Sequence, residues 1–91
     1  MLKYEYKLRF KNEINLEECQ KIKKTIYQNE NIDVFDIDFR YSAQFANEFG
    51  EAPKKIGTII FSFIYSGEDD CKLIIENIQE EVQKLGYEII Y

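Results

Sequence analysis

The chain's potential for chemistry lies first in its carboxylates. Asp33, Asp36 and Asp38 form a cluster, and the last two, being two positions apart, project from the same face of a strand. Carboxylate oxygens on one face can share a divalent cation, as in a metal-dependent nuclease. Two carboxylates alone make a poor site, and Lys7 and Arg9 are expected on the same face. We therefore expect a charge-balanced, solvated surface there and no metal site.

Nucleophilic chemistry has even less support. The chain contains no histidine, which excludes Ser-His-Asp and Cys-His arrangements within it. Its two cysteines, Cys19 and Cys71, are far apart in the sequence and fall on apolar stripes of predicted helices, where a thiol packs as a small hydrophobe. Its four glycines form no phosphate-binding loop. We expect a protein that is not an enzyme and holds no cofactor.

Charge is distributed unevenly along the 91 residues. Residues 1–55 hold ten Lys and Arg against ten Asp and Glu, whereas residues 56–91 hold two against seven, so the net charge of −5 belongs to the C-terminal part. An acidic domain repels phosphate backbones, which argues against nucleic-acid binding. A basic protein is the more suitable partner.

The N-terminal half contains two alternating segments with a helix between them. Leu2 to Phe10 alternate apolar and charged residues, which predicts a half-buried strand. Asn15 followed by Glu18 has the form of a capping box and predicts a helix over residues 16–29. In the next strand, Phe35, Ile37, Phe39 and Tyr41 are expected on one side and Asp36, Asp38 and Arg40 on the other.

The C-terminal half repeats this order of elements. Residues 56–65 are apolar on both sides, which is typical of a central strand. Ser66 to Asp69 match a second capping box, and the following periodicity predicts a helix over residues 68–85 that ends at Gly86. Residues 87–91 alternate again and predict a short final strand.

The predicted fold is α+β, of the ferredoxin-like βαββαβ type. In this arrangement a four-stranded antiparallel sheet has strand order 4-1-3-2 and both helices cover one of its faces. One domain spans residues 1–91. No segment has the length and apolarity of a membrane span or a signal peptide, so we expect a soluble, cytoplasmic protein with reduced thiols.

Three surfaces are candidates for binding a partner. The first is the polar side of the second helix, the second is the sheet face opposite the helices, and the third is the long hairpin after the second strand. An open sheet face is also suited to homodimerisation. The hairpin aromatics could instead fold back over the edge of the core. The residues selected are Glu76, Glu80 and Glu81 on the helix, Ile60 and Ile64 on the sheet face, and Tyr41, Phe45 and Phe49 on the hairpin.

We therefore expect a non-catalytic α+β domain that binds a basic protein. A small acidic chain of this kind resembles in physical type an immunity protein or antitoxin that inhibits a toxin, or a phage-encoded inhibitor of a host defence. The abundance of Lys over Arg, with many Ile, Asn and Glu, indicates a bacterial or phage source. The alternatives are a homo-oligomeric domain that binds a small molecule and, with less support, a metal-dependent nuclease.

Overall fold

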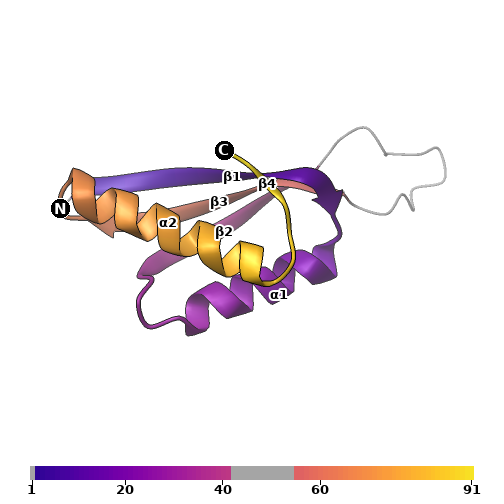
Figure 1. Cartoon of the computed structure of the whole chain (residues 1–91), viewed down its shortest axis with the longest axis horizontal. Coiled ribbons are helices and arrows are strands. Elements are labelled where there is room, and N and C mark those ends of the chain that lie inside the picture. Colours follow the sequence, from indigo (N-terminus) through magenta and orange to yellow (C-terminus); the bar gives the residue numbers. More distant parts are fainter. Residues whose placement is uncertain (1, 42–54) are drawn as a thin grey trace.

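The computed structural model describes residues 2–41 and 55–91 of the chain. Its elements follow the predicted order, strand, helix, strand, strand, helix, strand (Figure 1). They are β1 (Leu2–Ile14), α1 (Leu16–Gln28), β2 (Val34–Tyr41), β3 (Ile56–Tyr65), α2 (Glu68–Lys84) and β4 (Ile89–Ile90). Within this described part, no helix is both long and apolar enough to cross a membrane.

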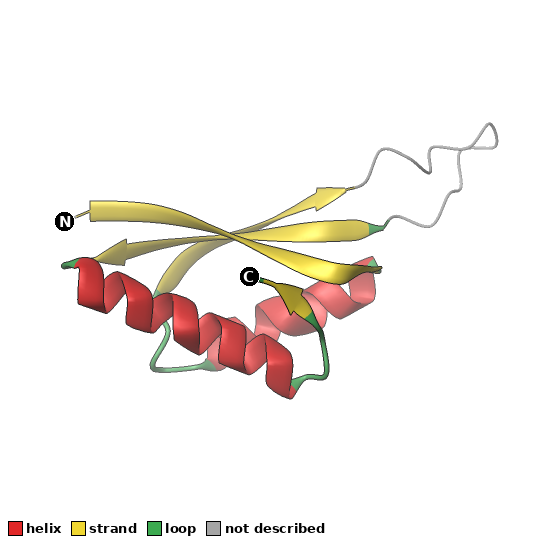
Figure 2. Cartoon of the chain, turned by 45° about the horizontal axis from the view of Figure 1, so that its top comes forward, coloured by secondary structure: helices red, strands yellow, loops and turns green. Residues whose placement is uncertain are grey.

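The strands form one antiparallel sheet in the order β2-β3-β1-β4, which is the predicted order read from the opposite edge. Both helices lie on the same side of the sheet (Figure 2). The prediction of an α+β fold with this strand order is therefore confirmed. The central position of β3 explains why its sequence is apolar on both sides.

The core lies between the helices and the sheet. Cys19, Ile22 and Ile26 from α1 and Ile74, Ile78 and Val82 from α2 are buried, at the helical spacing of three and four residues. They pack in one cluster with alternate residues of the strands, among which Leu8, Ile59, Phe61 and Phe63 are fully buried. The helix-facing stripes are those expected from the sequence.

Helix α1 begins as predicted. The Asn15 side chain accepts a bond from the backbone N–H of Glu18 at 2.8 Å, and the Glu18 carboxylate accepts one from the backbone N–H of Asn15 at 3.3 Å. These two bonds satisfy two of the amide groups that a helix start leaves without partners.

Helix α2 begins differently from the prediction, because its N-cap is Gly67, which has no side chain to accept a bond. Instead the Asp70 carboxylate accepts bonds from the backbone N–H of Ser66 at 2.9 Å and from its hydroxyl at 3.2 Å. The predicted second capping box is therefore wrong: the N-cap lies one residue later than predicted, and Ser66 donates hydrogen bonds there instead of accepting one. The end of α2 is as predicted, since Gly86 has a φ of 97° there.

Strand β2 contains a β-bulge that the alternation did not predict. Val34 pairs with Phe63 and Asp36 pairs with Ser62, so Phe35 is an extra residue on the β2 side. Val34 takes the core position, while Phe35 is exposed. The prediction that Phe35 faces the core is therefore wrong, and regular alternation resumes at Ile37, which is buried.

The lengths of β1 and β4 differ greatly. Strand β1 extends to Ile14, beyond its predicted end, with a register shift against β3 between Arg9 and Ile14. Strand β4 pairs with β1 only at Arg9 and Phe10. Most of the outer side of β1 is thus not covered by β4 (Figures 1 and 2).

Candidate interaction surface

One side of α2 points away from the core and combines acidic residues with an exposed leucine. Asp69, Leu73, Glu76 and Glu80 recur at spacings of three and four residues, opposite the buried stripe, and all four are exposed. Leu73 is 56% exposed, the same fraction as the N-terminal Leu2. We call these four residues the acidic face of α2.

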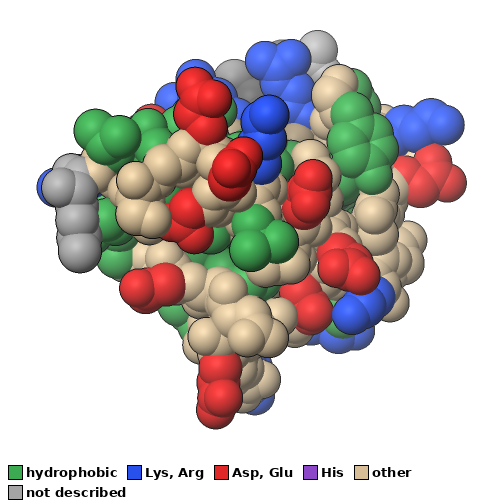
Figure 3. Space-filling view, turned by 60° about the vertical axis from the view of Figure 1, so that its left-hand side comes forward, with side chains coloured by type: hydrophobic (Ala, Val, Ile, Leu, Met, Phe, Trp, Pro, Cys, Tyr) green, Lys and Arg blue, Asp and Glu red, His purple; other side chains and the backbone are tan. Residues whose placement is uncertain are grey.

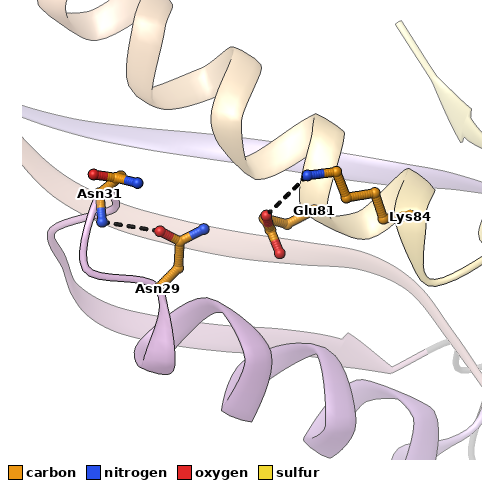
Figure 4. Close-up of polar contacts among 4 residues, drawn as sticks. All are labelled: Asn29, Asn31, Glu81 and Lys84. Carbon is orange, nitrogen blue, oxygen red and sulfur yellow. Dashed lines mark hydrogen bonds and ion pairs between the residues drawn. The ribbon is translucent and has the colours of Figure 1, made fainter.

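The third glutamate selected from the sequence does not belong to this face. Glu81 forms an ion pair with Lys84 at 3.6 Å, and its side chain is only 23% exposed. It lies on the side of α2 that faces α1, near the turn after α1 in which the Asn29 side chain accepts a bond from the Asn31 backbone (Figure 4). Glu81 is therefore paired with Lys84 and largely covered, whereas Glu76 and Glu80 are open to solvent.

Leu73 is the residue that the sequence reasoning missed. Figure 3 brings the start of α2 forward and shows acidic side chains spread around exposed apolar atoms. The signal for Leu73 was present in the sequence, because on a helical wheel it falls on the polar side with Asp69, Glu76 and Glu80, where a solvated helix needs no large apolar residue.

The sheet face opposite the helices is a second surface, and charged residues dominate it. Across β1, β3 and β2 the register aligns Arg9 with Thr58 and Arg40, Lys7 with Ile60 and Asp38, and Glu5 with Ser62 and Asp36. The charge therefore changes along the face, from two positive side chains in the Arg9 row, through one of each sign in the Lys7 row, to two negative side chains in the Glu5 row.

The two isoleucines selected on this face differ in exposure. Ile60 is only 6% exposed, although it is not part of the core cluster between sheet and helices. It therefore offers little area to a partner. Ile64 is 38% exposed and lies near the exposed Phe35, whose ring has the Lys3 Nζ 5.8 Å from its centroid. The accessible apolar area of this face is thus at one end.

The third predicted surface falls largely outside the described residues. The backbone of Tyr41 ends β2 and pairs with Ile56. Phe45 and Phe49 lie outside the described residues, so the hairpin surface stays a prediction.

The groups considered for chemistry are dispersed. Asp36 and Asp38 are both exposed on the sheet face, and Asp38 accepts a bond from the Phe39 backbone N–H at 2.9 Å. Within residues 2–41 and 55–91, no three metal-ligating side chains converge. Cys19 is fully buried, and burial, with a smaller contribution from the Glu18 charge, raises the pKa of its thiol to about 12. A thiol of this kind is a poor nucleophile at neutral pH.

No known protein family, curated protein or solved structure matches this chain. The proposals that follow therefore depend on the surfaces described above.

Proposed function

We propose that the protein is a non-catalytic binding domain that captures a basic protein through the acidic face of α2. By this proposal it acts as a stoichiometric inhibitor of the immunity-protein or antitoxin type, or as a phage-encoded inhibitor of a defence protein. The observation that carries the proposal is the exposure of Leu73 among Asp69, Glu76 and Glu80.

Leu73 has the properties of a binding anchor. Interfaces obtain most of their affinity from a few apolar or aromatic side chains that enter a pocket, surrounded by polar residues that exclude water. On the acidic face, one leucine occupies the middle of the stripe and carboxylates lie before and after it. A complementary partner has a small apolar depression ringed by lysine and arginine.

The helix dipole explains only part of the charge on this face. Acidic residues in the first turn, such as Asp69, favour the helix dipole. Glu76 and Glu80 lie beyond that turn and, at a spacing of four, repel each other, which costs an isolated helix about 0.2 to 0.5 kcal/mol. Attraction of a basic partner gives this placement a function, because a field of one sign accelerates association.

The proposal is tested by site-specific photo-cross-linking in the organism that encodes the chain. A photoreactive amino acid replaces Leu73 in one variant and Tyr27 in the control, which is an exposed aromatic residue on α1 beside Lys23. We expect position 73, and not position 27, to cross-link one basic protein, whose activity the purified chain inhibits at a one-to-one ratio.

Equal cross-linking from both positions, or a position-73 product whose activity the chain leaves unchanged, would contradict the proposal. A position-73 product that is an acidic protein would contradict the role of charge in particular.

A further inference from the structure

The outer edge of β1 is a strand edge without a partner in the described part of the chain. Strand β1 pairs with β3 continuously from Leu2 to Arg9 on its inner side. On its outer side β4 reaches only Arg9 and Phe10, and the backbone N–H of Lys11 bonds to the Glu88 carbonyl. Residues 2–8 therefore have no neighbouring strand on that side among the described residues.

The backbone groups that point outward along this edge can be assigned. In an antiparallel sheet, the N–H and C=O groups of successive residues point to alternate sides. Because Lys11 bonds towards β4, and the β1–β3 register is regular up to Arg9, the odd residues Lys3, Glu5 and Lys7 present their backbone groups outward. This edge is a regular template for one more strand.

The opposite edge of the sheet is blunted. By the same alternation the N–H of Phe39 in β2 points away from β3, and the Asp38 carboxylate accepts it at 2.9 Å. The bulge after Val34 breaks the regular spacing further along that edge. Both features are devices that protect an edge strand. Residues 2–8 of β1, whose register against β3 is regular, have neither a bulge nor a described side-chain bond of this kind.

Apolar surface accompanies the free edge. Leu2 is 56% exposed and Tyr4 is 40% exposed, although both belong to the helix-facing side of β1. Where β4 stops, a shallow hollow is lined by Tyr6, Lys7, Arg9, Gln79, Ile90 and Tyr91. The Gln79 amide bridges it by donating to the Tyr6 hydroxyl at 2.9 Å. A further strand on this edge would cover Leu2 and Tyr4.

We propose that this edge binds the same edge of a second copy, with the two β1 strands antiparallel and Tyr4 opposite Tyr4. This register places Lys3 of each copy opposite Glu5 of the other, on the open face of the sheet. It also places Leu2 opposite Tyr6 on the helix-facing side. The outward groups of Lys3 and Glu5 then form about four backbone hydrogen bonds between the copies. The two sheets become one continuous sheet.

Charge selects this register over its neighbours. Each register can be named by its centre, the residue that lies opposite the same residue of the second copy. Residues opposite each other must share a face of the sheet, so successive allowed registers move this centre by one residue. A centre at Glu5 opposes Glu5 to itself and Lys3 to Lys7, while a centre at Lys3 opposes Lys3 to itself. A centre at Tyr6 pairs Glu5 with Lys7, but it places Lys3 of the second copy opposite Arg9, where Ile90 of β4 already lies. Only the centre at Tyr4 pairs opposite charges on a free edge.

Exchanging the charges of Lys3 and Glu5 tests the proposal. The readout is the oligomeric state, measured by sedimentation equilibrium over a range of concentrations. We expect wild type to dimerise, and Lys3→Glu or Glu5→Lys alone to weaken the dimer by about ten- to a hundredfold, because each creates two like-charge pairs. The double variant Lys3→Glu/Glu5→Lys restores it. Lys7→Glu is the matched control on the same strand and face and leaves the dimer intact.

Cysteine cross-linking tests the register. Directly opposite residues that do not exchange backbone hydrogen bonds have Cα atoms about 4.5 Å apart, within the range of a disulfide. We expect Tyr4→Cys to form a covalent dimer on mild oxidation. Leu2→Cys, although more exposed, should not, because the two copies of residue 2 are about 13 Å apart along the strands.

Three results would overturn the proposal. They are a wild-type chain that stays monomeric up to millimolar concentration, single charge variants that dimerise as wild type does, and faster cross-linking through residue 2 than through residue 4. Loss of the dimer in Ile64→Asp with no effect of the Lys3 and Glu5 variants would assign dimerisation to the open sheet face instead. None of these results bears on the acidic face of α2, so the two proposals can fail separately.

Discussion

Replacement of Gly86 by alanine isolates the energetic cost of one backbone conformation. Gly86 follows α2 with a φ of 97°. Its N–H bonds to the Gln83 carbonyl at 2.9 Å, and the N–H of Tyr87 bonds to the Val82 carbonyl at 3.5 Å, which is the Schellman arrangement. This turn directs the chain from α2 into β4.

The size of the effect follows from the surroundings of Gly86. A Cβ atom built at this position has no other atom within 4 Å, so steric overlap does not contribute. An L-residue at positive φ costs about 1 to 2 kcal/mol, and the lower entropy of the unfolded alanine chain offsets about 0.4 to 1 kcal/mol of this. We expect Gly86→Ala to lower the free energy of unfolding by about 1 kcal/mol, equivalent to a melting temperature about 4 to 8 °C lower.

Urea unfolding at equilibrium measures this difference, with an unchanged m-value showing that only stability has changed. The matched control is a synthetic chain with D-alanine at position 86, for which positive φ is favourable. It should be more stable than wild type by about 0.4 to 1 kcal/mol. Equal losses of stability from both alanines would refute the reasoning, because they would show that the side chain itself does not fit.

Three further predictions concern the buried thiol, the first helix cap and the aspartates. The pKa of the Cys19 thiol is raised to about 12 in the folded protein, so with rising pH this thiol loses its proton first in the unfolded chain. The free energy of unfolding therefore falls as pH rises above about 9, with a slope of at most about 1.4 kcal/mol per pH unit. Unfolding measured between pH 8 and 11 should show a shallower decline in Cys19→Ala, and an identical decline would disprove the assignment. Asn15→Ala removes the bond to the Glu18 amide and should cost about 0.5 to 2 kcal/mol in chemical denaturation, more than a surface substitution does. Asp36→Asn combined with Asp38→Asn should change stability by less than about 0.5 kcal/mol. Neither this double variant nor wild type should cleave nucleic acid with Mg²⁺, and wild-type cleavage that is lost in the variant would overturn the proposal that the protein is not an enzyme.

The elements and their order could be predicted from the sequence because local signals agree with the tertiary structure. The alternation of Leu2 to Phe10, the capping box at Asn15 and the glycine at position 86 each act within a few residues. The structure confirms the strand, the cap and the turn, although Leu2 and Tyr4 on the helix-facing side of the strand are exposed. The strand order followed from connection rules that apply to any chain with this order of elements.

The predictions that were wrong concern places where an interaction with another part of the chain decides the local conformation. The bulge that exposes Phe35 is visible only in the pairing of β2 with β3, since the sequence permits uninterrupted alternation. The cap of α2 depends on Asp70 reaching back to Ser66, a contact outside the capping-box spacing. Ile60 is almost fully buried on the open face and lies between Lys7 of β1 and Asp38 of β2, a placement that the sequence of β3 alone does not reveal.

The rates of association with and dissociation from the cross-linked partner test most directly the central claim that the acidic face of α2 binds a basic protein. We predict that Leu73→Ala accelerates dissociation about tenfold with little change in association, because about half of a leucine side chain is buried on binding. Glu76→Lys combined with Glu80→Lys should instead slow association and remove its dependence on salt, while Tyr27→Ala on α1 changes neither rate. Unchanged rates in both α2 variants, together with loss of binding in Ile64→Asp, would contradict the account and assign the interface to the open sheet face.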